Sequence, residues 1–379
     1  MERKRTNPRD GWEQKIAEAG LIFDQAGGQP YWQEEAYYEF SAREVDDLEE
    51  ATNTLHSLCL EATAQVIEGD RLAELAIPVP VAEIIKESWR QERDFTLYGR
   101  FDLAYDGDSP PKLLEYNADT PTMLLEAAVV QWYWLEEKFG SADQFNSIHE
   151  RLIDQWKKLK WYFRHTPLYF TYAEGSLEDL ATVSYLMDTA AQAGLEPAEV
   201  VVSDIGWHRD RRQFVDLADK PIQGIFKLYP WEWLVAEEFG PHLLETYQEV
   251  QWLEPIWKLV LSNKGILPIL WELNSGHPNL LAASAVAPPT GDWVKKPRFS
   301  REGANVTVYR AGGDSFETPG NYGQEGFIYQ QLAALPSFDG YHPILGSWII
   351  GGEAAGLGIR ESTNLVTDDR SRFVPHLFT

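Results

Sequence analysis

Polar and apolar residues alternate along two short stretches of the chain that are separated by a turn sequence. In the stretch LYGRFDLAY, Arg100 and Asp102 share one face, and the apolar side chains share the other. In the stretch KLLEYNA, Glu115 and Asn117 likewise point to one side. The intervening DGDSPP is typical of a turn. The pattern predicts a β-hairpin with these four polar side chains on a single face.

The register of this predicted hairpin follows from its turn. Closure over DGDSPP sets Asp102 opposite Glu115 and Arg100 opposite Asn117. Two facing carboxylates, about 5 Å apart between their Cβ atoms, repel each other unless a cation or a proton lies between them. Oxygen ligands beside an arginine suggest a divalent metal site, and a surface cluster of ion pairs is the alternative.

Other stretches follow the helical period. The run EVDDLEEATNTLHSLCLEATAQVIEG predicts a long helix that ends near Gly69, and VAEIIKESWRQERD predicts the next one. After the hairpin, Thr120 is a good N-cap and Pro121 suits the first position of a helix that continues to Gly140. The N-terminal end of that helix would favour a phosphate or carboxylate close to the hairpin. A further helix is expected at roughly residues 142–165.

From Pro167 onward the pattern alternates between strands and a helix. LYFTYAE, EVVVSDI and PIQGIFKLYP predict strands, and LEDLATVSYLMDTAAQAG predicts a helix between the first two. Right-handed crossovers would make this a small parallel α/β unit. Loops at the carboxyl ends of such strands commonly receive ligands, so residues 173–179 and 227–233 are candidate substrate walls. Core packing explains the aromatic residues there equally well.

The last third of the chain combines strands with basic residues. LSNKGILPILW places Lys264 where a helix is expected to give way to a strand. WVKKPRFSREGANVTVY predicts two strands joined by a loop with Arg298, Arg301 and Gly303, a basic hairpin that could close over phosphates. FIYQQLAALP predicts a strand, and SWIIGGEAAGLGIRES predicts a hairpin that returns Arg360 to the sheet.

Composition narrows the classes of partner. The formal charge of −26 argues against nucleic acid and anionic membranes, although local basic residues could still hold a phosphate. A polyamine would be attracted, but solubility alone also explains such a charge. The single cysteine, Cys59, excludes an intramolecular disulfide and a cysteine zinc site, and we interpret it as a packed thiol. No leader sequence or apolar run of membrane length is found, so we expect a cytoplasmic protein.

Several familiar catalytic motifs are absent from the sequence. It contains no GxxxxGK[ST] loop, no GxSxG elbow and no HExxH, and its 8 histidines lack metal-ligand spacing. The polar hairpin face and the later basic residues remain. These are the parts of a nucleotide-dependent phosphoryl-transfer site without a P-loop, in which positioning and charge neutralisation do most of the work.

Five motifs together resemble a known family. GRFDLAYDGDSPPKLLEYNADTP, LSNKGILPILW, VKKPRFSREGANV, IYQQLAALP and GIRES occur in the order found in the synthetase domain of glutathionylspermidine synthase. That family of ATP-grasp ligases also includes stand-alone acid–amine ligase-like proteins. The resemblance implies an α+β or α/β chain with a glutathione synthetase-like ATP-grasp fold and a small inserted parallel α/β subdomain. This chain has neither the additional length nor the second cysteine of the family's amidase domain.

The resemblance also implies roles for individual residues. Magnesium would be held by Asp102, Glu115 and Asn117, and Arg100 would act on the reacting phosphoryl group. The residues implied to contact ATP are Lys264, Lys296, Arg301, Gln330 and Arg360, together with Arg100. Lys295 is an adjacent alternative to Lys296. Substrate would be contacted by Thr120, Glu178 and Asp179, although capping of the predicted helix also explains Thr120.

The implied reaction is the ATP- and Mg²⁺-dependent ligation of a carboxylic acid to an amine through an acyl phosphate. The acid and the amine are small molecules, with a glutathione-like peptide and a polyamine as candidates. A nucleotide-binding regulatory protein is the alternative, and a polyamine or peptide carrier is a third class. No oligomeric state follows from the sequence.

The length of 379 residues favours two or three interlocked domains. We expect a mainly helical region over residues 1–96 and a metal-binding hairpin with helices over 97–165. A small α/β substrate subdomain is expected over 166–250, and a nucleotide-binding region with a lid hairpin over 251–379. The last of these would interleave with 97–165.

Overall fold

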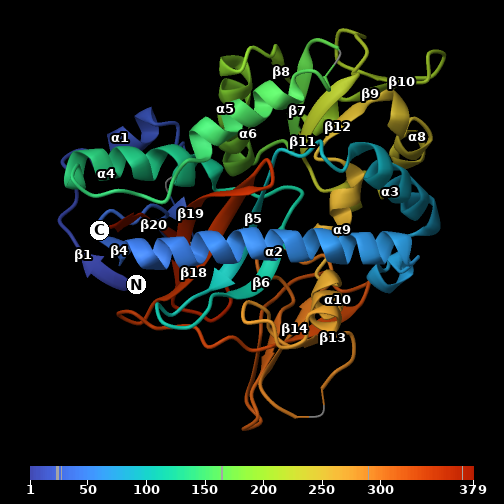
Figure 1. Cartoon of the computed structure of the whole chain (residues 1–379). Helices are drawn as coiled ribbons and strands as arrows, with labels where there is room; N and C mark the ends of the chain where they lie inside the picture. Colours follow the sequence, from blue (N-terminus) through green and yellow to red (C-terminus); the bar gives the residue numbers. More distant parts are fainter. Residues whose placement is uncertain (23–24, 27, 164, 289, 369) are drawn as a thin grey trace.

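A five-stranded antiparallel sheet lies at the centre of the protein (Figure 1). The computed structural model describes residues 1–379 except 23–24, 27, 164, 289 and 369. The strand order is β20-β19-β18-β5-β6, so the predicted hairpin pairs with strands from the far end of the chain. The strands are β5 (Tyr98–Ala104), β6 (Lys112–Asn117), β18 (His342–Ile350), β19 (Glu353–Ser362) and β20 (Arg372–Val374).

The register of the predicted hairpin is confirmed at its polar positions. Arg100 pairs with Asn117, and Asp102 pairs with Glu115. Directly after Asp102 the register shifts, because Leu114 is an extra residue in strand β6. The carbonyl of Leu114 accepts a hydrogen bond from a lysine of the neighbouring sheet instead. The sequence predicts a hairpin without a bulge, and beyond Asp102 the pairing that it predicts is therefore wrong by one residue.

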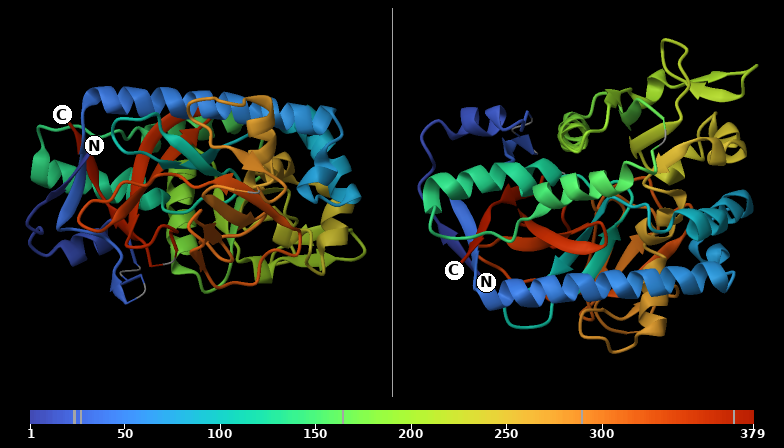
Figure 2. Two further views of the ribbon diagram at one scale, coloured as in Figure 1. Left: turned by 90° about the horizontal axis from the view of Figure 1, so that it is seen from below. Right: turned by 45° about the horizontal axis from the view of Figure 1, so that its top comes forward.

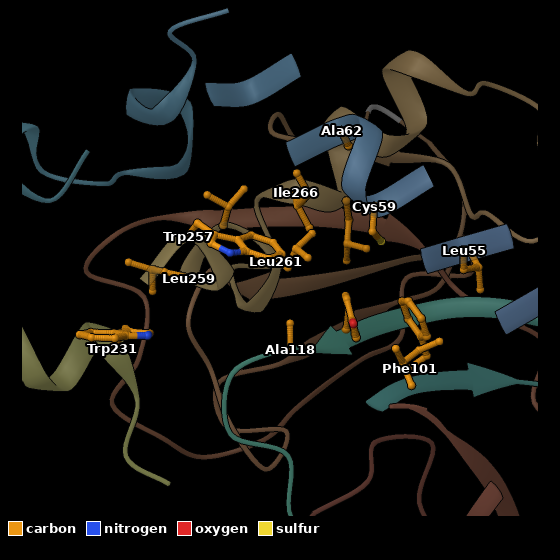
Figure 3. Close-up of a cluster of buried hydrophobic side chains, with 14 of the residues drawn as sticks. Leu55, Cys59, Ala62, Phe101, Ala118, Trp231, Trp257, Leu259, Leu261 and Ile266 are labelled. Carbon is orange, nitrogen blue, oxygen red and sulfur yellow. The ribbon is translucent and has the colours of Figure 1, made fainter. Parts of the chain in front are cut away.

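Helices cover both faces of the central sheet, and Figure 2 shows the sheet between them. On one face lies α2 (Ala42–Glu68), which begins at a capping box and ends at Gly69 as predicted. The buried Cys59 of α2 packs above the hairpin residue Phe101 (Figure 3), and burial raises the pKa of its thiol, which confirms the packed thiol. The other face is covered by the π-helical turn Glu126–Val130, α4 (Gln131–Phe139) and α5 (Ile148–Leu159).

The helix expected directly after the hairpin begins later than predicted. Helical residues start at Leu124, so the N-cap role expected for Thr120 is wrong. Met123 has a left-handed backbone, with φ of 70°, which separates the loop from the helix. The helix expected at 142–165 is also shorter, because Asp143 and Asn146 instead form single bridges to Phe378 and Gly356.

A second, parallel sheet confirms the predicted α/β unit. Its order is β12-β11-β7-β8, and all its neighbouring strands run parallel. The strand expected over EVVVSDI, residues 199–205, is wrong beyond its first residue, because the strand β8 ends at Glu199 and Val202–Asp204 form a 3₁₀ turn. The elements of the unit are β7 (Leu168–Tyr172), α6 (Leu177–Gln192), β8 (Pro197–Glu199), β11 (Gly224–Leu228) and β12 (Gln251–Leu253).

A third sheet contains the predicted basic hairpin. Its antiparallel order is β13-β17-β14-β15-β16, and β14 and β15 are the two arms of the hairpin. The strand expected over ILPILW is wrong, since this segment forms α10 (Ile266–Leu273), because a short apolar run does not distinguish a buried strand from a buried helix. The strands are β13 (Ala283–Ser284), β14 (Trp293–Pro297), β15 (Thr307–Tyr309), β16 (Ser315–Glu317) and β17 (Phe327–Gln331).

Both ends of the chain meet in a small sheet. The first and last strands, β1 (Glu2–Arg5) and β21 (His376–Phe378), each pair with β4 (Ala36–Phe40), which brings the termini together (Figure 1). The N-terminal region therefore contains strands as well as the expected helices. No helix in the ranges that the structure describes is both long and apolar enough to cross a membrane.

The remaining elements are short apart from α3 and connect these layers. They are β1 (Glu2–Arg5), α1 (Trp12–Glu18), β2 (Gln25–Ala26), β3 (Gln29–Pro30), β4 (Ala36–Phe40), α3 (Val79–Glu92), β9 (Gly206–His208), β10 (Gln213–Val215), α7 (Trp231–Leu234), α8 (Gly240–Glu245), α9 (Leu259–Ser262) and β21 (His376–Phe378).

Candidate active site

Two neighbouring cavities meet at the polar face of the hairpin. The smaller, of about 100 Å³, is lined by the central sheet and by the sheet that contains the basic hairpin. The larger, of about 320 Å³, is lined by the β5–β6 hairpin, the loop that follows it, the start of α6 and the β11–α7 loop. The cavities share the lining residues Glu115, Glu302, Gly303 and Thr367. A ligand in one cavity would therefore lie beside a ligand in the other.

Asp102 lies between two arginines. Its carboxylate accepts hydrogen bonds from Arg100 Nε at 2.8 Å and from Arg360 Nη2 at 2.5 Å. Arg100 also donates to the carbonyl of Thr122, and its side chain passes over Gly346 of β18. A Cβ at that glycine would come within 2.9 Å of Arg100 Cδ, so only glycine leaves room for the arginine. The predicted residues Arg100, Asp102 and Arg360 thus form one cluster, in which Arg100 and Asp102 are buried and Arg360 is partly exposed.

Glu115 faces two lysines from a different part of the chain. Its carboxylate lies 2.9 Å from Lys264 Nζ and accepts a hydrogen bond of 3.3 Å from the Asn117 amide. Burial alone would raise the pKa of Glu115, but Lys264, Lys296 and Arg360 outweigh it and lower the pKa well below its usual range. Glu115 is therefore ionised at neutral pH, and its negative charge attracts the nearby cations Lys264, Lys296 and Arg360 beside the smaller cavity.

The side chains of the two adjacent lysines of strand β14 have different surroundings. Lys296 lines the smaller cavity, where its Nζ donates to the Leu114 carbonyl at 2.9 Å and to Gln330 Oε1 at 2.7 Å. Lys295 points elsewhere, with its Nζ 3.9 Å from the centre of the Phe327 ring. Burial lowers the pKa of Lys296 to about 8, with Glu115 opposing the change. Of the two lysines, only Lys296 can meet a ligand in this cavity.

This pair provides a matched test of nucleotide binding. We expect Lys296→Met to weaken ATP binding by roughly 10- to 100-fold, the range of a lost charge-assisted contact. We expect Lys295→Met to leave the Kd unchanged. In the wild type the Kd should rise as pH passes above about 8, because Lys296 loses its charge there. Isothermal titration of both variants across pH checks this, and equal losses from both variants would contradict it.

Arg301 connects the loop of the basic hairpin to the larger cavity. Its guanidinium donates to Thr120 Oγ1 at 2.9 Å and to Glu232 Oε1 at 3.0 Å. It also lies over the ring of Trp233, 5.5 Å from the ring centre. The same loop approaches the chain at Thr367, where a Cβ on Gly303 would come within 2.5 Å of a carbonyl oxygen. The basic loop therefore covers the cavities, and Thr120 serves as its contact point.

The predicted substrate walls are brought together in the larger cavity. Glu178 and Asp179, at the start of α6, line it, and so does Trp233 of α7. Burial and the neighbouring Glu178 raise the pKa of Asp179 to about 6. Lys227, at the start of the second predicted wall, is instead fully buried and does not line the cavity; it pairs with Asp119 at 2.5 Å.

Two pairs that position this site could not be found from the sequence. Asp119 and Lys227 are both fully buried, and Asp119 also accepts the backbone N–H of Trp231 at 3.0 Å. Glu126 accepts a hydrogen bond of 2.7 Å from Tyr31, which lines the larger cavity. Each pair joins distant segments of the chain. The only signal in the sequence is an acidic residue beside the hairpin or within an apolar helix.

The donor set limits the kind of metal that could be held here. In the part of the chain that the structure describes, no group of three or more histidine, cysteine, aspartate or glutamate side chains could hold an ion. Asp102 and Glu115 supply two carboxylates, and Asn117 adds an amide oxygen. Mg²⁺ is commonly bound through one or two carboxylates with substrate phosphates and waters completing its shell. These residues therefore fit a magnesium ion that arrives with a nucleotide.

Comparison with known proteins identifies relatives of the whole chain. The profile of the family described as "Glutathionylspermidine synthase preATP-grasp" matches residues 3–379. A Haemophilus influenzae protein, provisionally named an acid–amine ligase, is 44% identical over 93% of this chain and 92% of its own length. The trypanothione synthetase of Crithidia fasciculata is 30% identical over 84% of this chain. The bifunctional glutathionylspermidine synthetase/amidase of Escherichia coli is 27% identical over 89% of this chain.

The extent of these matches differs between relatives. They cover 53% of the trypanothione synthetase and 58% of the bifunctional enzyme, so this chain spans little more than half of either protein.

Among solved structures, a glutathione synthetase-like effector from Globodera pallida matches with a TM-score of 0.58 at 8% identity, covering 99% of this chain and 98% of its own. The predicted glutathione synthetase-like ATP-grasp fold is confirmed. The named relatives are ligases, which confirms the predicted class of ATP-dependent carbon–nitrogen ligase.

Proposed function

Because the chain belongs to the glutathionylspermidine synthase family, we propose that it joins a peptide-like carboxylic acid to an amine in an ATP- and Mg²⁺-dependent reaction through an acyl phosphate. One observation carries the proposal: a narrow cavity with buried lysines adjoins a wider cavity with acidic walls, and Glu115 lines both. A phosphoryl donor in the first cavity and a carboxylate acceptor in the second would meet at that residue. Neither a nucleotide-binding regulatory role nor a carrier role requires two adjoining cavities.

The residues that line the smaller cavity suit the base and phosphates of a nucleotide, although at about 100 Å³ the cavity has to widen to admit the whole molecule. Lys264 and Lys296 supply positive charge, and Gln330 fixes Lys296 through its amide. The apolar wall for a base is supplied by Leu114, Val294, Val306, Val308, Leu332, Leu335, Ile344, Leu365 and Val366. Arg301 and its loop would exclude water, which protects an acyl phosphate from hydrolysis.

The reaction needs charge stabilisation at the hairpin. The substrate carboxylate attacks the γ-phosphorus of ATP, ADP leaves, and the amine then displaces phosphate from the acyl carbon to give an amide. Arg100 would face the phosphoryl group in transfer, where fixed positive charge stabilises the transition state. Asp102, Glu115 and Asn117 would hold Mg²⁺, which when bound neutralises phosphate charge. Arg360 holds Asp102 in place through a hydrogen bond.

The acidic wall of the larger cavity supports a cationic amine as the second substrate. Glu178 and Asp179 would hold it, and Thr120 would contact the acid beside Arg301. Glutathione and spermidine, which the names of the relatives contain, are therefore the first pair to test. We retain cytoplasmic location as a prediction from the sequence.

The proposal is tested by ADP release from the purified protein with MgATP, glutathione and spermidine, extended to other peptides and amines. We expect release that requires both an acid and an amine. We expect Glu115→Gln to lower the rate on the order of 100-fold, as for other single electrostatic contacts at a transition state. ATP binding without ADP release for every pair would instead favour the regulatory alternative. Ligand binding indifferent to ATP and magnesium would favour a carrier.

A further inference from the structure

A buried carboxylate lies directly behind the wall of the larger cavity. Glu126 is the first residue of the π-helical turn Glu126–Val130, and the residue is only 2% exposed. Among the residues that the structure describes, no lysine, arginine or histidine forms an ion pair with Glu126. Its side-chain partner is the hydroxyl of Tyr31, which donates to Oε1 at 2.7 Å. Turns of π-helix are frequent at functional sites, although they do not by themselves assign one.

The charges around Glu126 come from three directions. Tyr31 faces it from the segment before β4, Glu178 from α6 and Arg100 from β5. Burial and the like charge of Glu178 raise the pKa of Glu126 to about 7, against the opposing effects of Tyr31 and Arg100. The carboxylate can therefore gain or lose a proton near neutral pH.

Tyr31 connects this carboxylate to the cavity. Its side chain lines the wall together with Arg100, Asn117 and Glu178. Burial, Glu126 and Glu178 raise the pKa of Tyr31 well above its usual range, against the opposing effect of Arg360, so the hydroxyl stays protonated. A protonated hydroxyl that donates to Glu126 can still accept a hydrogen bond from a ligand with its own oxygen.

The reaction requires a proton acceptor at this wall. An alkylamine is protonated at neutral pH and has no free electron pair with which to attack an acyl phosphate. We propose that Glu126 accepts, through the hydroxyl of Tyr31, the proton that the amine must lose. The inference rests on the proposed ligase function and adds a proton-relay pair to it.

All protons and electron pairs of the amide-forming step are accounted for without a further reactant. The ammonium N–H breaks and its proton passes to Tyr31 Oη, while the proton of that hydroxyl passes to Glu126 Oε1. The freed electron pair forms the C–N bond, and the acyl C–O bond breaks with its electrons leaving on phosphate. The second proton of the new C–N centre leaves with the phosphate. Glu126 then returns its proton to solvent.

Asp179 is the rival acceptor, because it lines the same cavity and its pKa is also raised, to about 6. It lies at the start of α6, where Ser176 accepts a hydrogen bond from its backbone N–H. If Asp179 only binds the cationic amine, its loss raises the KM for the amine and leaves the pH profile unchanged. Loss of Asp179 is therefore expected to change the KM for the amine, whereas loss of Glu126 is expected to change the pH profile.

The test compares two nucleophiles in Tyr31→Phe and Glu126→Gln. Hydroxylamine is largely neutral at pH 7 and traps an acyl phosphate without needing a base. We expect both variants to form hydroxamate from MgATP and glutathione at close to the wild-type rate. With spermidine at pH 7 we expect a loss on the order of 100-fold, the lower range of general-base catalysis. The deficit should shrink roughly tenfold per pH unit as the amine deprotonates by itself.

Glu92→Gln is the matched structural control. Glu92 is another buried carboxylate, which accepts hydrogen bonds from the hydroxyls of Ser88, Tyr162 and Tyr247, and it lies outside the two cavities. We expect any effect of this variant to appear in stability and not in the pH profile. A pH profile altered by Glu92→Gln or Asp179→Asn, but not by Glu126→Gln or Tyr31→Phe, would overturn the proposal.

The proposal and the ligase function can fail separately. If the wild type forms no hydroxamate and releases no ADP, the ligase function fails. If the wild type ligates and both variants lose hydroxamate and amide formation equally at every pH, the proton relay fails alone. Carbon-13 labelling of glutamate carboxyl groups gives a readout without turnover. One resonance should titrate near pH 7 in the wild type and be absent from Glu126→Gln, and absence of such a resonance from the wild type would contradict the relay.

Discussion

Replacement of Arg100 by alanine is expected to lower kcat for ADP release by about 10²- to 10³-fold, with little change in the Kd for ATP. The guanidinium is one fixed charge in a buried site, and removal of one such contact to a transition state costs this much in other enzymes. Burial alone would lower the pKa of Arg100, but Asp102 and the nearby carboxylates raise it, so the charge is permanent. Single-turnover and steady-state ADP assays measure the effect.

The variant should remain folded, because Asp102 keeps its second partner. Arg360 donates to the carboxylate of Asp102 at 2.5 Å, so loss of Arg100 leaves no unpaired buried anion. Arg100→Lys retains the charge but loses the two-pronged contact with Asp102, and we expect an intermediate kcat. A kcat for Arg100→Ala within a few-fold of wild type would contradict the assigned role. A loss of ATP binding equal to the loss in kcat would place Arg100 in ground-state binding instead.

Replacement of Asp119 by asparagine is expected to destabilise the protein by about 3 to 5 kcal/mol, the cost of breaking a fully buried ion pair. Lys227 and Asp119 are both 0% exposed, and the carboxylate also accepts the backbone N–H of Trp231. Burial already lowers the pKa of Lys227 against the effect of Asp119, so loss of the anion leaves a buried cation without its ion-pair partner. Urea unfolding measures the change in free energy of unfolding.

An exposed pair is the control for this experiment. Asp154 and Lys157 are separated by 2.9 Å, with side chains 66% and 57% exposed. Asp154→Asn should therefore cost less than about 1 kcal/mol. Equal losses at both sites would contradict the account. Because Asp119 also fixes the loop between β6 and the larger cavity, we expect Asp119→Asn to raise the KM for the acid as well.

The hairpin could be predicted from the sequence because two local signals agree. Alternation fixes which side chains share a face, and the turn fixes the register, so Arg100 and Asp102 were correctly paired with Asn117 and Glu115. The bulge after Asp102 does not follow from the sequence, since it depends on the neighbouring sheet, whose Lys296 donates a hydrogen bond to the Leu114 carbonyl.

Other features depend on contacts between distant segments. Thr120 has the chemistry of an N-cap, but its hydroxyl accepts a hydrogen bond from Arg301, and the helix starts four residues later. The segment after Lys264 is a helix because tertiary packing decides the state of a short apolar run. Asp119 with Lys227 and Glu126 with Tyr31 join segments about a hundred residues apart, so no local pattern could reveal them.

The central claim is that a nucleotide and its magnesium bind between the polar hairpin and the basic lid. A crystal structure with a nonhydrolysable ATP analogue and Mg²⁺ tests it most directly. We predict the base between Leu114, Val294 and Leu332 of the smaller cavity, with the phosphates extending toward Lys264 and Lys296. A metal should lie between Asp102 and Glu115. Nucleotide bound elsewhere, or phosphates without metal at these carboxylates, would contradict the account.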